Sequence, residues 1–434
     1  MKPLPSLNTG NHSVEAARLL EPLKEEMVQL LQNLVRANSV AVPPNGSETV
    51  AQEVLLEFSR AHAIEVEIYA LESLADSDHP LVRHDRNYEG RHNLIARLPG
   101  SGGGRSVMFS GHVDTVPAGR DGWNESPWSG SVHGDRLYGR GSYDMKGGLA
   151  ASFAAIAALK KAGIKLSGDV FCESVIDEEW GGGGGTLASR LKGNLADACV
   201  IPEPTDLAIY RASRGGYVVD VEVKAGDAQN YFSREEVVSP AIPMGRLLRW
   251  VEELAARRKA IPATGAYEGF SDPAPVQVLA LEANSFDSEV PLSTPLSARA
   301  RLYFQFLPQE NVNQVIGEIK RSFYGFCEDD SFFRVYRPEW KAFFDPALEG
   351  HEVEADHDWT KVLARNARTL IGDATTVTAA EYPCDAFINQ QFGMPTLIFG
   401  PKGAAAHNAN EYVEISSVIT TATVLLAAAL EWAG

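Results

Sequence analysis

The sequence predicts an α/β protein into which a smaller α+β domain is inserted. Short apolar runs alternate with helical segments in the first and last parts of the chain, as in a sheet packed between helices. Between them, apolar and polar residues alternate, as in half-exposed strands. A chain of 434 residues also exceeds the size of one ordinary core. We therefore expect a catalytic domain made of residues 1–213 and 341–434, interrupted by an insert at 214–340.

Composition excludes several classes of protein. The hydrophobic content of 44% and charged content of 22% are typical of a globular protein. A net charge of −18 disfavours nucleic acid as a partner, because phosphates would be repelled. The four cysteines form no CxxC pair, which favours reduced thiols in a cytoplasmic protein. There is no signal-like N-terminal stretch and no run of about 18 apolar residues, so we expect no membrane association.

In the first part of the chain, helical periodicity begins at about Glu15 and continues through residues 23–39. The PPNGSE segment interrupts it, and a second amphipathic helix follows over residues 51–62. Five apolar runs then predict strands: HNLIARL, SVMFSGHVD, GDVFCESVID, DACVIPEP and, much later, PTLIFGP. Strands interleaved with helices favour a sheet covered on both faces.

The insert follows another order. Strands are expected at 217–225, 275–283, 297–306 and 331–337, and helices at 241–259 and 311–326. The resulting β-α-β-β-α-β order is that of the ferredoxin-like unit.

The first candidate site follows the strand ending in GHVDTVP. His112 and Asp114 are two residues apart, so on an extended strand they face the same side. An imidazole can bind a metal through one nitrogen while a carboxylate holds the other and fixes the tautomer. The alternative is a histidine at a strand end beside an ordinary turn aspartate.

Four further segments place polar residues after predicted strands or in glycine-rich turns. Asp144 precedes an alanine-rich helix, which it could simply cap, although a carboxylate there could also bridge two cations. Glu178 and Glu179 follow a strand and precede five glycines, where solvated acids are also common. Glu203 ends the strand in ACVIPEPT, and His407 lies in a loop of small residues after the strand PTLIFG.

Each segment is weak evidence alone, but together they are not. Open α/β sheets bind ligands beyond the carboxyl ends of their strands, so these side chains are expected to meet. Two imidazoles and three carboxylates suit zinc, with manganese or cobalt as the alternatives.

These motifs, in this order, resemble those of the aminohydrolases that include acetylornithine deacetylase, succinyl-diaminopimelate desuccinylase and glutamate carboxypeptidase. The matching segments are GHVDTVP, LYGRGSYDMKGG, DEEWGGGG, IPEPT and FGPKGAAAHNANEYV, and the likeness extends from about residue 25 to the end. It implies a zinc-aminopeptidase-like catalytic domain with an inserted ferredoxin-like lid, which usually forms a homodimer.

The resemblance also implies a role for each site residue. Asp144 would bridge two metal ions, His112 and Glu203 would complete one site, and Glu179 and His407 the other. Glu178 would be the general base that takes a proton from the metal-bridging water. The spacing of Asp114, two residues after His112, separately predicts that Asp114 orients the His112 ring.

The insert departs from the family pattern. The family's lid histidine has no counterpart, because no histidine lies between His133 and His351. Asn230 or Gln229 stands near its place. Ser288 or Glu289 stands where the family has an asparagine. The arginine that usually binds a substrate carboxylate aligns with Gln305, and Arg211, Arg214 or Arg301 could replace that cation.

The leading hypothesis is therefore a metal-dependent hydrolase of a small-molecule amide, such as an N-acyl amino acid or short peptide. The altered lid favours an alternative, which is hydrolysis of a non-peptide C–N bond in an amidine, ureide or aryl amine. A non-catalytic metal-binding homologue is the third hypothesis, and the retained Glu178 argues against it.

Overall fold

The computed structural model describes residues 12–119, 122–225, 239–283, 295–343, 345–372 and 374–434. The chain forms two compact units. The first contains residues up to Ala212 together with Glu352–Ala380 and Cys384–Gly434. The second contains Ser213–His351 and Glu381–Pro383.

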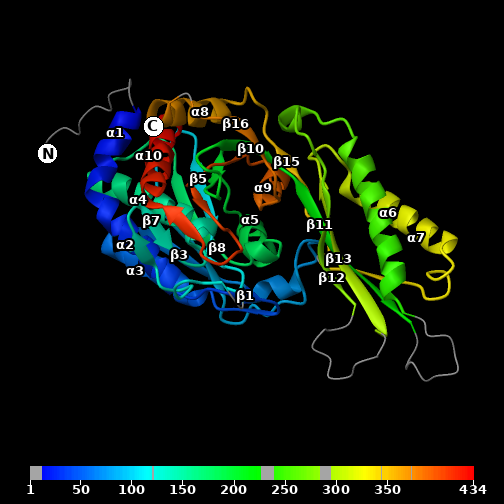
Figure 1. Cartoon of the computed structure of the whole chain (residues 1–434). Helices are drawn as coiled ribbons and strands as arrows, with labels where there is room; N and C mark the ends of the chain where they lie inside the picture. Colours follow the sequence, from blue (N-terminus) through cyan, green and yellow to red (C-terminus); the bar gives the residue numbers. More distant parts are fainter. Residues whose placement is uncertain (1–11, 120–121, 226–238, 284–294, 344, 373) are drawn as a thin grey trace, which may run out of the picture. The chain divides into compact units, whose positions relative to one another are not determined.

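A nine-stranded mixed sheet forms the centre of the first unit (Figure 1). Strands β5, β8 and β9 are parallel neighbours, and β17 continues the parallel set beside β9. All six residues of β5 are buried, which places this strand in the middle of the layer. The strand order is β15-β10-β17-β9-β5-β8-β4-β3, with β16 paired to β10. The bounds are β3 Glu65–Ala70, β4 His92–Leu98, β5 Val107–His112, β8 Val170–Val175, β9 Cys199–Ile201, β10 Ile209–Ser213, β15 His351–Glu352, β16 Val377–Ala380 and β17 Thr396–Ile398.

Helices cover both faces of this sheet, as the sequence predicted. Figure 1 shows α1, α2, α4 and α10 on one side of the strands and α5 and α9 on the other. Helices α4 and α10 are buried along most of their length. The small alanine side chains of α4 let neighbouring elements pack closely against it. The bounds are α1 His12–Leu20, α2 Lys24–Arg36, α3 Thr49–Ala61, α4 Gly147–Ala162, α5 Ala188–Leu191, α8 Asp358–Ile371, α9 Ala386–Gln391 and α10 Ile415–Trp432.

Helix α10 is the one helix among the described residues whose length and apolar composition would allow it to cross a bilayer. Since 72% of that stretch is buried inside the protein, it serves here as a core helix.

A second, small sheet in the first unit brings distant loops together. Its order is β18-β19-β7-β6, with all neighbours antiparallel. The bounds are β6 Ser131–His133, β7 Arg136–Tyr138, β18 Gly403–Ala404 and β19 Tyr412–Glu414, and a separate hairpin pairs β1 Ala41–Val42 with β2 Asn45–Gly46. Because β7 pairs with β19, the segment that follows β7 lies beside the loop that joins β18 to β19.

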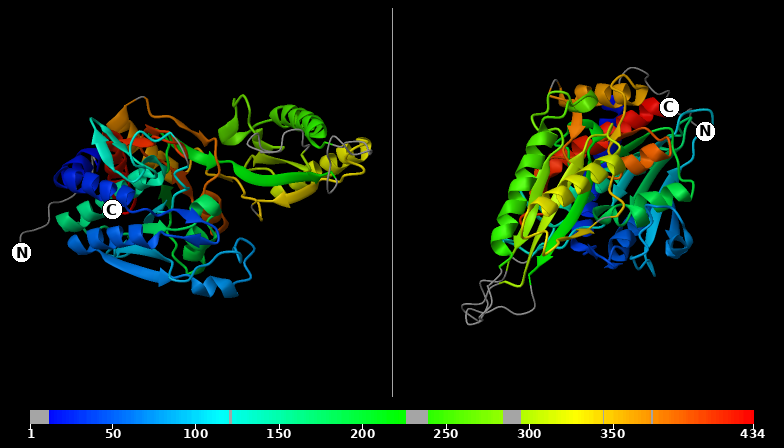
Figure 2. Two further views of the ribbon diagram at one scale, coloured as in Figure 1. Left: turned by 60° about the horizontal axis from the view of Figure 1, so that its bottom comes forward. Right: turned by 90° about the vertical axis from the view of Figure 1, so that its right-hand side faces the viewer.

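The second unit has the predicted β-α-β-β-α-β order. Its antiparallel sheet runs β12-β13-β11-β14, and helices α6 and α7 lie side by side on one face (Figure 2). The apolar side chains of both helices and of the sheet form one core, which includes Leu247, Trp250, Phe304 and Phe323. The bounds are β11 Gly215–Lys224, α6 Ala241–Lys259, β12 Val276–Glu282, β13 Ser297–Phe306, α7 Val312–Asp329 and β14 Glu339–Ala342.

The strand expected at residues 331–337 is wrong. That segment is a turn, and the last strand of the second unit is β14, which begins at Glu339. The carboxylate of Asp330 accepts hydrogen bonds from the main-chain N–H groups of Phe332 and Phe333. This local capping holds the chain in a turn despite the strand propensity of SFFRVYR.

Candidate metal centre

The five expected ligands and Glu178 converge in the first unit. His112 is the last residue of β5, Glu178 and Glu179 follow β8, and Glu203 follows β9. These three strands are parallel neighbours, so their carboxyl ends open on the same edge of the sheet. Asp144 lies between β7 and α4, and the small sheet places the His407 loop beside that segment.

Asp144 lies between the two imidazoles. Its Oδ1 is 3.2 Å from His112 Nε2, and its Oδ2 is 3.3 Å from His407 Nε2. Each oxygen of this one carboxylate therefore faces a different histidine. That is the arrangement expected of a carboxylate that bridges two cations.

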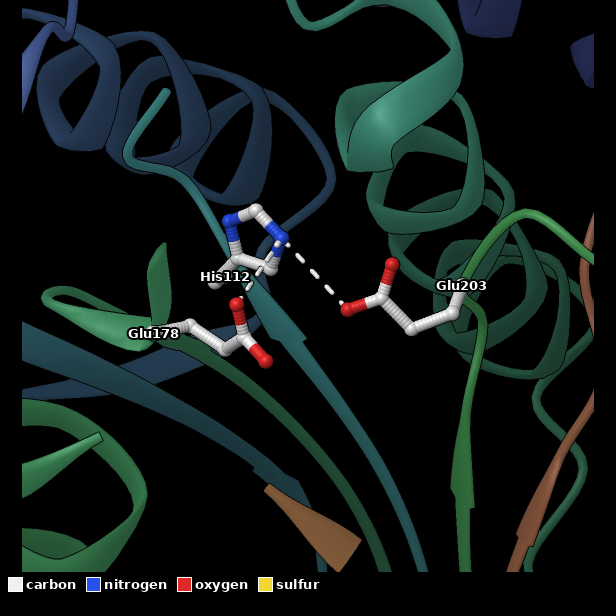
Figure 3. Close-up of side chains that lie close together, drawn as sticks. All are labelled: His112, Glu178 and Glu203. Carbon is white, nitrogen blue, oxygen red and sulfur yellow. Dashed lines mark ion pairs between the residues drawn. The ribbon is translucent and has the colours of Figure 1, made fainter. Parts of the chain in front are cut away.

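Each histidine has a second carboxylate at the same nitrogen. Glu203 Oε1 lies 3.4 Å from His112 Nε2, and Glu179 Oε2 lies 3.0 Å from His407 Nε2. Glu178 Oε2 is 3.9 Å from His112 Nε2. Figure 3 shows the carboxylates of Glu178 and Glu203 directed toward the His112 ring from two different segments.

Asp114 contacts both His112 and the two glutamates Glu178 and Glu179. The Nδ1 atom of His112 lies 3.0 Å from the main-chain oxygen of Asp114 and 3.5 Å from its carboxylate. The two oxygens of that carboxylate also accept hydrogen bonds from the main-chain N–H groups of Glu178 and Glu179, at 3.3 Å each. Asp114 is fully buried, so it fixes the His112 ring and the two glutamates together.

The glycine run after Glu179 has a steric cause. Gly182 has φ +70°, and a Cβ atom there would lie 2.2 Å from a carboxylate oxygen of Asp385. A Cβ atom on Gly185 would lie 2.0 Å from the main-chain oxygen of Ile176. Only glycine lets the chain turn this closely beneath the two glutamates.

The electrostatics of the site are those of crowded acids. Burial, together with neighbouring Asp144, raises the pKa of Glu203 to about 8. Burial also raises the pKa of Glu178 well above its usual value, with Asp385 and the other glutamates adding to the shift. Burial alone would lower the pKa of His407, but Glu179 and Asp144 outweigh it and raise the pKa to about 11.

This donor set fits a pair of divalent cations. His112, Asp144 and Glu179 form one group, and His112, Glu178 and Glu203 form another. Within each group the ligand atoms lie within 4.8 Å of one another. Four buried or half-buried carboxylates crowd around two imidazoles, and bound cations would offset the repulsion among these acids when they are ionised. Nitrogen and oxygen donors of this kind are those that zinc, manganese and cobalt accept.

Sequence reasoning missed Glu411, which is buried beside Asp144. Its carboxylate accepts hydrogen bonds from Arg140 and from the main-chain N–H of Asp144. The signal available in the sequence was an acid four residues after His407, in HNANE, and nothing local distinguished it from a surface residue.

The residues expected to bind substrate belong to the second unit or lie outside the described residues. Arg214 and Gln305 belong to the second unit, where Arg214 Nη1 donates to Gln305 Oε1 at 2.8 Å. Gln305 Nε2 donates to the Tyr303 hydroxyl and to the main-chain oxygen of Glu381. The remaining candidates, Asn230, Gln229, Ser288 and Glu289, lie outside the described residues.

The other two arginines considered as replacement cations both have acidic partners. Arg211 pairs with Glu352 at 2.6 Å, and Arg301 pairs with Asp220 at 2.7 Å. Each of these two guanidinium groups is therefore already engaged in an ion pair.

Comparisons with known proteins agree with the sequence motifs and the fold. Residues 108–431 match the model of Peptidase family M20/M25/M40. A curated relative, N-formyl-4-amino-5-aminomethyl-2-methylpyrimidine deformylase from Bacillus subtilis (strain 168), is 23% identical over 95% of this chain and 96% of its own length. Succinyl-diaminopimelate desuccinylase from Gluconobacter oxydans (strain 621H) is 30% identical over 77% of this chain and 83% of its own length.

Solved structures show the same fold. The di-peptidase Dug1p from Saccharomyces cerevisiae has a TM-score of 0.77 and 14% identity, covering 98% of this chain and 99% of that one. The YXEP protein from Bacillus subtilis, described as a dinuclear metal-binding peptidase, has a TM-score of 0.59 and 14% identity, covering 94% of this chain and 98% of that one. The expected family resemblance and fold class are confirmed.

Proposed function

The chain belongs to Peptidase family M20/M25/M40, and on that premise we propose that it hydrolyses an amide C–N bond in a small molecule with two divalent metal ions. The observation that carries this proposal is the position of Asp144, whose two oxygens face His112 and His407 at 3.2 and 3.3 Å. The names of the two curated relatives describe removal of a formyl and a succinyl group.

The ligands divide into two sets around Asp144. His112 and Glu203 would hold one ion, and Glu179 and His407 the other. Bound divalent ions would lower the pKa of a water molecule and stabilise negative charge on the carbonyl oxygen. We propose zinc as the resident metal because it accepts mixed imidazole and carboxylate ligands, and elemental analysis of purified protein tests this assignment.

Glu178 is the proposed general base. Its carboxylate reaches the centre, at 3.9 Å from His112 Nε2, and lies farther from that nitrogen than those of Asp144 and Glu203. It would remove a proton from the attacking water and return it to the leaving nitrogen. Asp114 contributes by holding the main-chain N–H of Glu178, which sets the direction of that side chain.

Replacing Glu178 with glutamine tests this assignment. The substrate is first found by measuring release of free amine across N-acyl amino acids, dipeptides, formamides and ureides. On that substrate we expect Glu178→Gln to keep its metal content while turnover falls by roughly 10²–10⁴-fold. Glu57→Gln, at an exposed position of α3, is the control. Undiminished turnover in Glu178→Gln would remove this residue from the mechanism.

A second candidate is hydrolysis of a non-peptide C–N bond on the same centre. It is favoured by Gln305, which stands where the family resemblance expects a carboxylate-binding arginine and which is already hydrogen-bonded within the second unit. The deformylase relative, which aligns over nearly its whole length, is named for a substrate that is not a peptide. The same panel separates the candidates by whether peptides or non-peptide compounds release amine.

We also propose a homodimer formed through the second unit. Among the described residues, β12 hydrogen-bonds to β13 alone and so forms an edge of the sheet. Val278, Leu279 and Leu281 on this strand are 41–52% exposed, and an apolar edge strand is suited to pair with another chain. Sedimentation should show a dimer that Leu281→Lys weakens, and a monomeric wild type would contradict the proposal.

A cytoplasmic location is proposed from the thiols. All four cysteines are free and buried, which fits a reducing compartment. Fractionation of the source cells tests it.

A further inference from the structure

Glu411 has no role in the proposed reaction. Its carboxylate nevertheless forms hydrogen bonds with the segment that carries the proposed metal ligand Asp144. It is fully buried and immediately precedes β19. The pairing of β19 with β7 places it beneath residues 139–144, the segment that carries Asp144. The main-chain oxygen of Glu411 accepts a hydrogen bond from Gly139 N at 2.9 Å, which fixes the register of this approach.

Both carboxylate oxygens of Glu411 hold this segment. Oε2 accepts from Arg140 Nη1 at 2.5 Å and from the main-chain N–H of Gly141 at 3.0 Å. Oε1 accepts from the main-chain N–H groups of Tyr143 and Asp144 at 3.0 and 3.1 Å. Four donors thus meet one carboxylate, and three of them belong to the backbone that positions Asp144.

The backbone here needs such a partner. Asp144 has φ −113° and ψ 97°, which is not helical, so its N–H lies outside the hydrogen-bond pattern of the following helix α4. A buried N–H without an acceptor is costly, and charged acceptors form the stronger hydrogen bonds. Glu411 satisfies these groups and thereby fixes the direction in which the Asp144 carboxylate leaves the backbone.

Glu411 also belongs to the loop that carries His407, the second histidine of the proposed centre. It lies four residues after His407, in a loop where His407 and Asn410 both have φ +60°. One side chain therefore ties the loop that carries the bridging carboxylate to the loop that carries an imidazole of the same centre.

We propose that Glu411 is a positioning residue of the two-metal centre: it holds Asp144 and the His407 loop in the geometry that lets one carboxylate serve both ions. This inference rests on the proposed metal centre. Both carboxylate oxygens of Glu411 are engaged by these four donors, so its effect on the centre would act through Asp144. The positioning role predicts that substitution of Glu411 weakens metal binding and slows turnover, while substrate affinity is largely retained.

Cobalt titration of the metal-free protein is the test, followed by visible absorption, because the d–d bands of Co²⁺ report ligand geometry. We expect Glu411→Gln to weaken Co²⁺ binding by about 10–100-fold, the usual range for residues that orient metal ligands, and to change the absorption bands. In cobalt-saturated protein, kcat should fall while KM changes by less than about threefold.

The matched control is Glu310→Gln in the second unit. Glu310 also pairs with an arginine, Arg258, and accepts a main-chain N–H, from Leu307. We expect this variant to bind Co²⁺ as the wild type does. If Glu411→Gln does not fold, as judged by circular dichroism, Glu411→Asp keeps the charge but withdraws it by one methylene, and the same changes are expected.

The outcomes separate this inference from the proposed function. Wild-type protein that binds two Co²⁺ ions, together with a folded Glu411 variant of equal affinity and unchanged spectrum, would overturn the positioning role alone. Wild-type protein that binds no Co²⁺ would overturn the metal centre and the positioning role with it. A shifted spectrum with weakened binding, absent from Glu310→Gln, supports the proposal.

Discussion

Substitution of Asp114 by asparagine is the most direct test of how the site is held together. The carboxylate of Asp114 accepts one hydrogen bond from Glu178 N and one from Glu179 N, and lies 3.5 Å from His112 Nδ1. Asparagine has nearly the same shape but only one acceptor oxygen. It must therefore leave one of the two glutamate N–H groups facing an amide NH₂.

The magnitude follows from that loss. A hydrogen bond to a charged group contributes about 1.5–3 kcal/mol. Losing one such bond in the productive geometry therefore lowers kcat/KM by roughly 10- to 150-fold, because about 1.4 kcal/mol corresponds to tenfold. This agrees with the 10–100-fold effects typical of groups that orient metal ligands.

The assay is kcat/KM at saturating metal on the substrate identified by amine release. Asp220→Asn in the second unit is the control, because Asp220 forms a partly exposed pair with Arg301 and should contribute little. An Asp114→Asn variant with wild-type metal content and kcat/KM within about twofold of wild type would refute the argument that Asp114 organises the site.

Three further predictions concern metal, protons and stability. Chelation should abolish activity, and zinc, cobalt or manganese should restore it, whereas activity in protein shown by elemental analysis to be metal-free would contradict the mechanism. Metal binding at pH 7 should release protons, because the pKa values of Glu203 (about 8) and His407 (about 11) leave both groups protonated without metal. Calorimetry in buffers of different ionisation enthalpy measures the number of protons released, and a value of zero would contradict the prediction. Arg190→Met should destabilise the protein by about 3–5 kcal/mol in urea unfolding, because it strands the buried carboxylate of Glu173, and a loss below about 1 kcal/mol would show that the two serines bonded to Glu173 suffice.

The convergence of three candidate ligands could be predicted from the sequence because each is marked by the end of an apolar strand. His112 ends one apolar strand, Glu179 and Glu203 follow two others within four residues, and parallel strands bring their carboxyl ends to one edge. Asp144 and His407 carry a weaker local signal, since neither ends a strand of the central sheet. They meet only because the small sheet pairs β7 with β19, and those very short strands carry little periodic signal.

Glu411 shows where such prediction ends. Its partners lie about 270 positions earlier in the chain, and no local pattern marks an acid that accepts four hydrogen bonds from a distant turn. The prediction of a strand at residues 331–337 failed for a related reason. Its aromatic and β-branched residues favour a strand, but the carboxylate of Asp330 accepts hydrogen bonds from two main-chain N–H groups, those of Phe332 and Phe333, and these bonds hold the segment in a turn.

Arg214 and Gln305, two residues of the second unit that were expected to bind substrate, are both already hydrogen-bonded within that unit. Arg214 is 2% exposed, and its guanidinium donates to Gln305 Oε1 and to the main-chain oxygens of Asp272 and Glu381. Gln305 in turn uses its amide N–H groups on Tyr303 and Glu381. Neither side chain therefore offers the free, paired donors with which an arginine grips a carboxylate.

It follows that a carboxylate on the substrate should gain little from Arg214 or Gln305. We predict that an N-acyl amino acid and the corresponding N-acyl amine, which lacks only the carboxylate, are hydrolysed with kcat/KM values within about tenfold of each other. A bidentate charged clamp would give a larger ratio, since each charge-assisted bond contributes about 1.5–3 kcal/mol. Measuring both compounds with wild type and with Gln305→Ala decides the point. A preference above about 100-fold for the carboxylate, lost in Gln305→Ala, would show that Gln305 recognises it after all.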